Sequence, residues 1–350
     1  MVKGKISTQS VGWLYFFIHF SCEVACFYFL FSRLNDNPLW WILAILFDAL
    51  AFLPQTIFGV LQDKFATLPF GVIGAILIFT ALILPFDIIS LIIIGLGNAL
   101  LHIDGAEHTL RDSNGKITPN AVFVGGGSFG VITGQLLGVL KIKYLVFVPV
   151  GLILISVALA FVIYKSHALK SDDGWTGRSL EITSNINQTL LILLIMFAVA
   201  VRSYIAYALP IEWKKTTFQA ILLFSFMGIG KMLGGIFADG IGYRKTTIIS
   251  LLVALPFLLF GNSIMTLSLI GVMLFSMTMP ITVGILFSKL PDNPGLAFGI
   301  TTVGLFLGII PALVFTLPTL LSHQIVVLVL SVIALVSILI CLRKEKKNVK

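Results

Sequence analysis

Twelve stretches of mostly apolar residues follow one another along this chain, and their length constrains the fold more than any other feature. A helix needs about 20 apolar residues to cross the hydrocarbon core of a membrane. Only 11% of the residues are charged and 58% are hydrophobic. Soluble domains carry about 25% charged residues, so this chain has too few charges to cover a water-facing surface. The sequence predicts an all-α membrane protein with transmembrane helices at 11–32, 39–60, 68–86, 88–108, 120–140, 144–164, 188–210, 217–238, 246–263, 265–288, 295–317 and 323–342.

The basic residues predict how these helices are oriented. With both termini inside and twelve crossings, sixteen Lys and Arg residues face the cytoplasm and five face the opposite side. Cytoplasmic loops of membrane proteins are rich in Lys and Arg, so we expect a multi-pass protein of the cytoplasmic (inner) membrane with both termini in the cytoplasm. This placement beside anionic lipid accounts for the net charge of +8 without a nucleic-acid partner. No secretory cleavage pattern precedes the first span, so we expect the start of the chain to be retained.

Landmarks in the first half of the chain recur in the second half at a nearly constant offset. A G-x-x-x-D motif ends the second span at Asp63 and the eighth at Asp239, 176 positions apart. Pro119 precedes the glycine-rich fifth span and Pro294 the eleventh, 175 positions apart. Such paired repeats are typical of transporters, whose substrate site lies at the repeat interface near the bilayer midplane. We therefore expect an N-terminal six-helix bundle at 1–164, a cytoplasmic central loop at 165–187 and a C-terminal six-helix bundle with a short basic tail at 188–350.

These features resemble the major facilitator superfamily, with its twelve spans, its six-plus-six repeat and its G-x-x-x-D-[RK] motif. Four strings resemble the fosmidomycin-resistance-like branch of that superfamily: HFSCE at 19–23, GLGNALLH at 95–102, RSYIAY at 202–207 and NPGLAFG at 293–299. The resemblance covers essentially the whole chain. It implies a monomeric secondary transporter that works by alternating access, with export as the favoured direction.

The resemblance also implies a gate at the cytoplasmic face, formed by the repeated motif and its basic neighbours: Gly59, Asp63, Lys64, Gly235, Asp239, Arg244 and Lys245. This chain departs from the usual pattern in three places. The basic pair that usually follows the first motif is absent, Gly240 replaces the first basic residue of the second motif, and Ile103 replaces a common Pro. We therefore expect a gate that is weaker or differently wired.

Ionisable side chains inside the spans are the candidates for substrate and proton binding, because a charge in hydrocarbon is costly and is usually functional. Glu23 lies near the centre of the first span, and His19 precedes it by one helical turn on the same face. Asp48 lies near the centre of the second span. A carboxyl group in a low-dielectric site can load and release a proton near neutral pH, so these three residues predict proton coupling. The alternative is that they only tie helices together through hydrogen bonds.

Two basic side chains lie within the spans of the second half. Arg202 is expected at a depth similar to that of Glu23, where the two side chains face each other or face the substrate. Its planar guanidinium suits a carboxylate or phosphonate, so we predict an anionic or zwitterionic small molecule; the alternative is a structural pair. Lys231 is a further site candidate, or it extends toward the cytoplasmic edge. Tyr207, which belongs to the branch-like string, is also a candidate site residue.

Four ionisable residues, His102, Asp104, Glu107 and His108, cluster near the cytoplasmic end of the fourth span. We weigh three roles for them: a proton path or gate network, solvated interface residues, and a metal site, of which the metal site is the least favoured. Among them, His102 and Asp104 are the candidate site residues. A separate ridge of glycines at every fourth position predicts close helix packing in the fifth span, at Gly126, Gly130, Gly134 and Gly138.

The remaining sequence features limit the function classes. No phosphate-binding loop of the GxxxxGK[ST] type is present, so ATP does not drive the transport. The three Cys residues form neither a disulfide framework nor a metal-binding pattern, and we expect no cofactor and no resident metal. No HExxH or GxSxG motif points to an enzyme. A lipophilic drug efflux pump and a non-transporting receptor or scaffold on the same fold stay open as alternatives to a proton-coupled antiporter.

Overall fold

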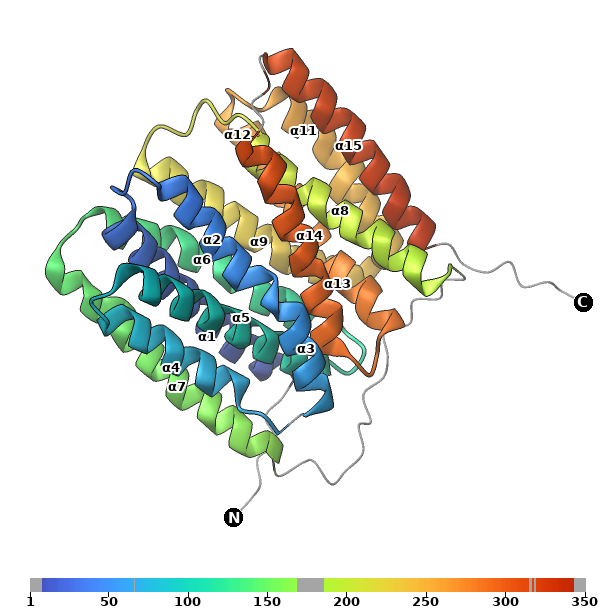
Figure 1. Ribbon diagram of the computed structural model, residues 1–350. Coiled ribbons are helices and arrows are strands. Elements are labelled where there is room, and N and C mark those ends of the chain that lie inside the picture. Colours follow the sequence, from blue (N-terminus) through green and yellow to red (C-terminus); the bar gives the residue numbers. More distant parts are fainter. Residues whose placement is uncertain are drawn as a thin grey trace, which may run out of the picture.

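A computed structural model describes residues 8–65, 67–111, 113–168, 186–314, 317 and 319–342. Within these ranges the regular structure is entirely helical (Figure 1). The basic tail and most of the central loop at 165–187 lie outside the described residues. The prediction of an all-α fold is confirmed.

The helices of the first half are α1 (Thr8–Phe29) with the π-helical turn η1 (Leu30–Leu34), α2 (Trp40–Phe52), α3 (Pro54–Lys64), α4 (Phe70–Ile83), α5 (Asp87–Arg111), α6 (Thr118–Val139), the short 3₁₀ turn η2 (Lys143–Val146) and α7 (Phe147–Ala168). Those of the second half are α8 (Gln188–Ala208), α9 (Thr217–Ile241), α10 (Tyr243–Ile248), the π-helical turn η3 (Ile249–Val253), α11 (Ala254–Phe260), α12 (Met265–Ser276), α13 (Thr278–Lys289), α14 (Pro294–Val314) and α15 (Leu320–Cys341).

The described residues contain eleven helical segments that are long and apolar enough to cross a membrane, and the shorter apolar helix α4 occupies the remaining expected span. Helix α4 is shorter than the expected 68–86 because it starts after Pro69 and ends just before Pro85. The expected long connection at 109–119 is also shorter. Helix α5 continues to Arg111, which pairs with Glu107 one turn earlier, and Asn114 and Gly115 then turn the chain with positive φ angles of 51° and 80°.

The same set of helix contacts occurs in both halves. Helix α1 packs against α6 and α7, and in the second half α8 packs against α14 and α15. Helices α4 and α5 form a pair, as do α11 and α12. The two halves lie side by side in Figure 1, in blue to green and in yellow to red. The two halves thus share the same pattern of helix contacts.

Contacts between the two halves are concentrated toward the end of the molecule where α1 begins and α15 ends, here called the termini end; the opposite end is the far end. Helix α14 contacts α3 more extensively than it contacts α2, and α6 contacts α9. The hydroxyl groups of Thr56 and Thr302 donate across the interface, to the carbonyl oxygens of Gly299 at 3.2 Å and Phe52 at 3.1 Å. Toward the far end, by contrast, Gly304 of α14 packs on α8 of its own half. The protein is therefore closed at its termini end.

Candidate functional site

Two carboxylates bridge the halves at the termini end, and we call them the latches. Asp63, at the end of α3, accepts hydrogen bonds from the backbone N–H groups of Gly295 and Leu296, each at 2.8 Å. These N–H groups belong to the first turn of α14 in the other half. The first N–H groups of a helix lack partners within the helix and carry a partial positive charge. A carboxylate therefore suits this position, and the charges of Arg111 and Glu107 on α5 also act on it.

The second latch repeats this geometry in the opposite direction. Asp239, near the end of α9, accepts hydrogen bonds from the backbone N–H groups of Ile117 and Thr118, each at 2.9 Å. It also accepts one from the Thr118 hydroxyl at 2.5 Å. Three basic residues of the predicted gate are exposed and pair with neither latch in the described part of the chain: Lys64, Arg244 and Lys245. Both latches therefore accept hydrogen bonds from backbone N–H groups at the beginning of a helix in the other half.

The latch helices approach each other at glycines. A Cβ added to Gly59 would lie 2.4 Å from the carbonyl carbon of Gly295. A Cβ added to Gly235 would lie 2.3 Å from the Cβ of Ala121. Glycine is therefore required at both positions for α3 to reach α14 and for α9 to reach α6.

The glycine ridge of α6 lies against α1. Added Cβ atoms on three of its members would lie 2.4–2.5 Å from backbone oxygens of α1, and one on Gly138 would lie 2.8 Å from the Phe31 Cβ. The three members are Gly126, Gly130 and Gly134. The close approach brings the ionisable residues of α1 up to α6.

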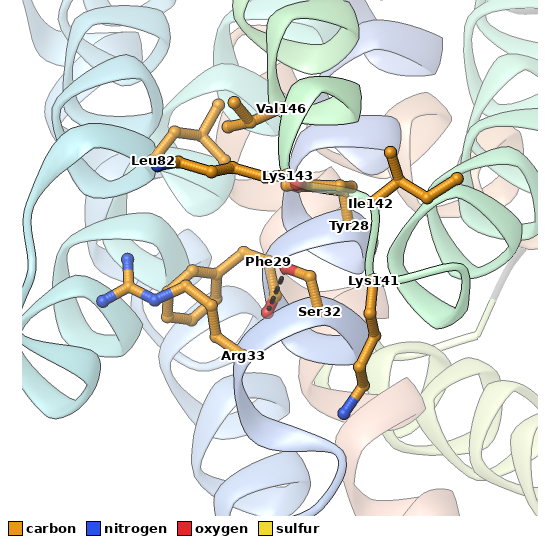
Figure 2. A pocket seen from close by; sticks show the side chains of 9 residues that line it. All are labelled: Tyr28, Phe29, Ser32, Arg33, Leu82, Lys141, Ile142, Lys143 and Val146. Carbon is orange, nitrogen blue, oxygen red and sulfur yellow. Dashed lines mark hydrogen bonds between the residues drawn. The ribbon is translucent and has the colours of Figure 1, made fainter.

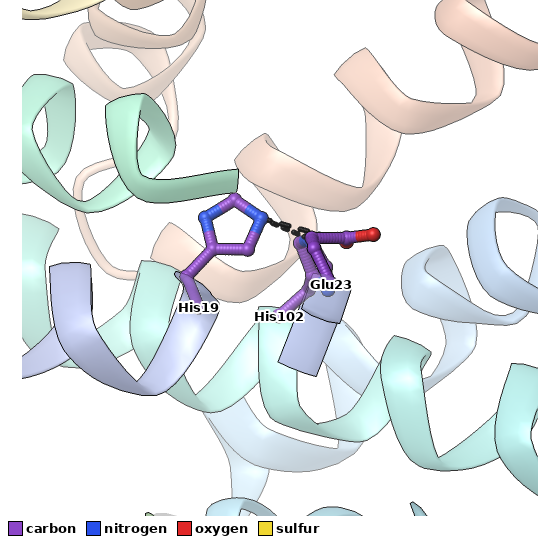
Figure 3. Close-up of side chains that lie close together, drawn as sticks. All are labelled: His19, Glu23 and His102. Atoms are coloured by element: carbon purple, nitrogen blue, oxygen red, sulfur yellow. Dashed lines mark hydrogen bonds and ion pairs between the residues drawn. The ribbon is translucent and has the colours of Figure 1, made fainter. Parts of the chain in front are cut away.

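A buried cluster joins α1 to α5 in the first half, and we call it the histidine cluster: His19, Glu23, Asn98 and His102. Figure 3 shows the imidazole of His19 directed toward His102 and Glu23. The Nε2 atoms of the two histidines are 2.8 Å apart. The Glu23 Oε1 atom lies 3.6 Å from the His19 Nε2 and 3.4 Å from the His102 Nε2, and the Asn98 amide donates to the same oxygen at 3.1 Å.

The other nitrogen of each imidazole meets a backbone carbonyl oxygen. The His19 Nδ1 lies 2.8 Å from the oxygen of Phe123 on α6, and the His102 Nδ1 lies 2.9 Å from the oxygen of Asn98 on α5. The three ionisable side chains are only 5–7% exposed. The hydrogen bond at Nδ1 therefore fixes the orientation of each ring, and the Nε2 atom points into the cluster.

The cluster has the residue types of a metal site, because His19, Glu23 and His102 each offer one ligand atom within 4.8 Å of the others. Two imidazoles on a tetrahedral Zn²⁺, with Zn–N bonds of about 2.0–2.1 Å, place their nitrogens about 3.3 Å apart. The observed Nε2–Nε2 distance of 2.8 Å is shorter and matches a hydrogen bond. The geometry favours a hydrogen bond between the rings over two metal–ligand bonds.

Arg202 lies buried in the second half and forms no ion pair with any residue that the structure describes. Its side chain lies on α8, is 9% exposed, and leaves its buried Nε without a hydrogen-bond partner. None of the ion pairs among the described residues includes Arg202, so the expected alternative of a direct Glu23–Arg202 pair is not formed. The charge of Lys231 on α9 interacts with those of both Arg202 and Glu23. Lys231 is half-buried on α9.

The two remaining candidates from the sequence differ in exposure. Asp48 on α2 is half-buried, has no ion pair among the described side chains, and interacts electrostatically with Glu23. Tyr207, near the end of α8, is 54% exposed. Tyr207 lies toward the far end of α8, whereas Asp48 lies past the middle of α2. Among the predicted substrate and proton residues, the carboxyl groups of Glu23 and Asp48 lie on the first half, and the basic side chains of Arg202 and Lys231 lie on the second.

The predicted cluster at the end of α5 divides into two parts. His102 joins the histidine cluster, whereas Asp104, Glu107 and His108 form a second network toward the termini end. Asp104 accepts a hydrogen bond from the Tyr15 hydroxyl at 2.7 Å, and the His108 Nδ1 lies 3.2 Å from Glu107. These three residues are 4–6% exposed, so the reading of them as solvated interface residues is wrong. All three lie on the last part of α5, and Asp104 connects this helix to α1 through Tyr15.

A surface cavity of about 290 Å³ lies at the far end of the first half (Figure 2). It contains basic residues, but Arg33 pairs with Asp87 at 2.6 Å and Lys141 pairs with Asp36. Figure 2 shows the Arg33 and Lys141 side chains extending in different directions. Arg33 and Lys141 are already paired and do not converge, and the third basic lining residue, Lys143, is exposed, so we do not choose this cavity as the candidate site.

Sequence reasoning missed Asn98, Phe123 and Gly127, which complete the histidine cluster. Asn98 precedes His102 by four residues, as His19 precedes Glu23. This shared i, i+4 spacing was the available signal that one face of each helix is polar. Phe123 contributes a carbonyl oxygen, and Gly127 contributes only space, since an added Cβ would lie 2.4 Å from the His19 Nε2. Neither contribution leaves a sequence signal.

Comparison with known proteins identifies the fold. No family model matches the sequence, and no curated protein matches it. Among solved structures, the chain is similar to a major facilitator superfamily transporter, FucP, in the outward conformation, with a TM-score of 0.62 and 15% identity over 95% of this chain and 98% of that one. It is also similar to the human organic anion transporter MFSD10 (TETRAN), with a TM-score of 0.65 and 15% identity over 95% and 97% of the two chains. The chain therefore has the major facilitator fold, and its resemblance to the fosmidomycin-resistance-like branch stays a prediction.

Proposed function

We propose that this protein is a secondary transporter that exports a small organic anion across the cytoplasmic membrane by alternating access, in exchange for protons. The fold supports the transport mechanism, because proteins with this fold include a fucose:proton symporter from E. coli and a human organic anion transporter. The latches support alternating access, because they close the interface at one end through hydrogen bonds between the halves. Breaking these bonds would leave the packing within each half intact.

The observation that carries the anionic substrate is the unpaired Arg202. A guanidinium that is nine-tenths buried loses most of its hydration, and leaving it without a counter-ion is strongly unfavourable. A bound carboxylate, phosphonate or phosphate would accept two parallel hydrogen bonds from the planar guanidinium. Lys231 adds a second positive charge close by. We assign Arg202 as the anchor of the substrate anion and Lys231 as its electrostatic support.

Proton coupling is assigned to the acidic side of the interface. Glu23 with its two histidines, and Asp48 nearby, lie on the first half, opposite the basic residues of the second half. Protons and substrate thus bind to different halves of the molecule. We place both termini and the latches in the cytoplasm, following the excess of basic residues on that side, and the closed latches then correspond to an outward-facing state.

The test is ligand binding to purified full-length protein in detergent, measured as the shift in thermal unfolding temperature across a panel of organic anions, organic cations and lipophilic drugs. A ligand at about 100 times its dissociation constant stabilises a protein by about 2.7 kcal/mol. We expect an organic anion to stabilise the wild type and to lose this effect in Arg202→Gln. Arg33→Gln, which changes an arginine already paired with Asp87, is the matched control.

Three outcomes would contradict the proposal. Stabilisation by cations or lipophilic drugs alone would replace it with the drug-efflux alternative. Anion binding that survives Arg202→Gln would remove the anchor role. In proteoliposomes with an imposed pH gradient, uphill anion movement that is unaffected by collapse of that gradient would remove proton coupling.

A further inference from the structure

The hydrogen bonds of His19 and His102 determine which ring nitrogens carry protons. A carbonyl oxygen can only accept a hydrogen bond, so a ring nitrogen 2.8 Å from the Phe123 oxygen must carry a hydrogen. The same holds for the His102 Nδ1, 2.9 Å from the Asn98 oxygen. A neutral imidazole has one N–H only. If both rings were neutral, both Nε2 atoms would therefore be bare lone pairs.

Two bare lone pairs 2.8 Å apart would repel each other. The contact between the two Nε2 atoms becomes attractive only when one of them carries a hydrogen and donates it to the other. With both Nδ1 atoms already protonated, that hydrogen is an additional proton, and the pair of rings carries one positive charge. We propose that His19 and His102 bind one shared proton between their Nε2 atoms, with the Glu23 carboxylate as its counter-ion.

The surroundings support this assignment. The Glu23 Oε1 lies within 3.6 Å of both Nε2 atoms, and Asn98 donates its amide hydrogen to that oxygen. An oxygen that accepts from Asn98 and faces a cationic pair is suited to a carboxylate. Two other charges interact with the cluster: Lys231 on α9 acts on His102, and Asp48 on α2 interacts with Glu23. The loaded unit of two histidines and one glutamate has no net charge, as its burial requires.

Loss of the proton has a mechanical consequence. Three acceptors, namely the two Nε2 atoms and the Glu23 Oε1, would then face one another, so the rings must separate. The His19 ring cannot move toward α6, because it already packs on Gly127 and on the Phe123 ring at a centroid distance of 4.8 Å. Phe123 in turn contacts Phe298 of the other half, with ring centroids 6.0 Å apart. Ring separation would therefore be transmitted to the interface close to the latches.

This inference rests on the proposed transport function for its role but not for its test. The chain has five histidines, so full-length protein labelled with ¹⁵N only at histidine gives a simple NMR spectrum. We expect one strongly deshielded proton that couples to the Nε2 atoms of both His19 and His102, with both Nδ1 atoms protonated. On raising the pH, we expect the two rings to change together, with release of one proton per chain.

Two variants test whether the shared signal arises from the contact between His19 and His102. In His102→Gln the Gln amide donates to the His19 Nε2 in place of the proton, so His19 should become a neutral ring protonated at Nδ1 and the shared signal should vanish. Gly127→Ala keeps both histidines, but its Cβ would lie 2.4 Å from the His19 Nε2, so it should also remove the shared signal. His323→Gln on α15 and Gly151→Ala on α7, where an added Cβ meets nothing within 4 Å, are the matched controls.

Several results would overturn the shared proton. One is two rings that titrate independently, and another is a neutral ring protonated at Nε2 in the wild type. A third is a signal that changes when a chelator strips Zn²⁺ from the sample, which would make the cluster a metal site. If the shared proton is absent while anion binding still depends on Arg202, only this inference fails. If the shared proton is present and no anion binds, the proposed substrate class fails and the proton site stands.

Discussion

The latch at Asp63 gives the sharpest test of how the termini end stays closed. In Asp63→Asn the side chain keeps its shape and one oxygen acceptor but loses its negative charge. Both hydrogen bonds it accepts, at 2.8 Å from the N–H groups of Gly295 and Leu296, cross from one half to the other. Opening the termini end must break them, so their free energy enters the equilibrium between the two states directly.

The magnitude follows from the type of bond. A hydrogen bond to a charged group contributes about 1.5–3 kcal/mol and a neutral one about 0.5–1.5 kcal/mol. The Gly295 N–H binds Oδ1 and the Leu296 N–H binds Oδ2. The Asn variant therefore weakens one bond by roughly 1 kcal/mol and loses the other, about 1.5–3 kcal/mol, because its NH2 group cannot accept a hydrogen bond. Loss of the interaction with the α14 dipole adds about 0.3–1 kcal/mol. The total of about 3–5 kcal/mol changes the ratio of closed to open protein by a factor of roughly 150 to 5,000.

The assay is a distance measurement between spin labels on the two halves at the termini end. Lys64 on α3 and Arg244 on α10 are both exposed and lie on opposite halves, so Lys64→Cys and Arg244→Cys supply the labelling sites. We expect Asp63→Asn to add a population with a longer distance. Asp36→Asn, which changes a carboxylate at the far end, is the control. A distance distribution unchanged by Asp63→Asn, or changed equally by Asp36→Asn, would refute the latch.

Three further predictions follow from the same geometry. Asp239→Asn should shift the equilibrium in the same direction as Asp63→Asn, and because the two latches join different helix pairs, the double variant should shift it by the sum of the two effects, as the same spin labels would show. Gly130→Ala places a Cβ 2.4 Å from the Phe20 carbonyl oxygen and should destabilise the protein by about 1–3 kcal/mol in detergent unfolding, whereas Gly151→Ala should be neutral or stabilising. Phe123→Leu keeps the backbone carbonyl but removes the ring contact with Phe298, so the anion should still bind while proton-driven uptake into vesicles falls; unchanged coupling would contradict this route.

The fold was predictable because hydrophobicity determines it almost alone. Each apolar stretch of about 20 residues can satisfy its backbone hydrogen bonds only as a helix in the membrane, and the structure bears this out along the described chain. The breaks inside spans were harder to place. The second span divides at Pro54, and in the ninth span the π-helical turn Ile249–Val253 lies just before Pro256. A Pro inside a helix removes the hydrogen bond to the residue four positions earlier. Whether the helix divides or widens at that point depends on how neighbouring helices pack, and a single sequence does not contain that information.

The candidate site was predictable in its residue types and not in its partners. An ionisable side chain is energetically costly inside hydrocarbon. This cost alone identifies the following candidates in the sequence: Glu23, His19, Asp48, Arg202 and Lys231. Which of them meet depends on side-chain direction and helix spacing. Sequence depth suggested Glu23 opposite Arg202, but the close approach of α1 and α5 joins Glu23 to His102 instead. Similarly, the latch motif was visible, while its acceptance of backbone N–H groups depends on where α6 and α14 begin.

The duplicated halves differ in a way that bears on mechanism. Each half supplies one latch carboxylate. Opening the termini end therefore requires both helix pairs, α3–α14 and α6–α9, to separate. The ionisable groups are not duplicated: at the repeat offset of 176, the counterpart of Glu23 is Val199 and that of Arg202 is Cys26. The acidic and histidine groups thus belong to the first half and the basic groups to the second. No ion pair joins these two sides among the residues described. Under the proposed function, we therefore expect closure of the far end to depend on a bound anion that reaches from Arg202 to the first half, so that occupancy of the site controls the conformational change.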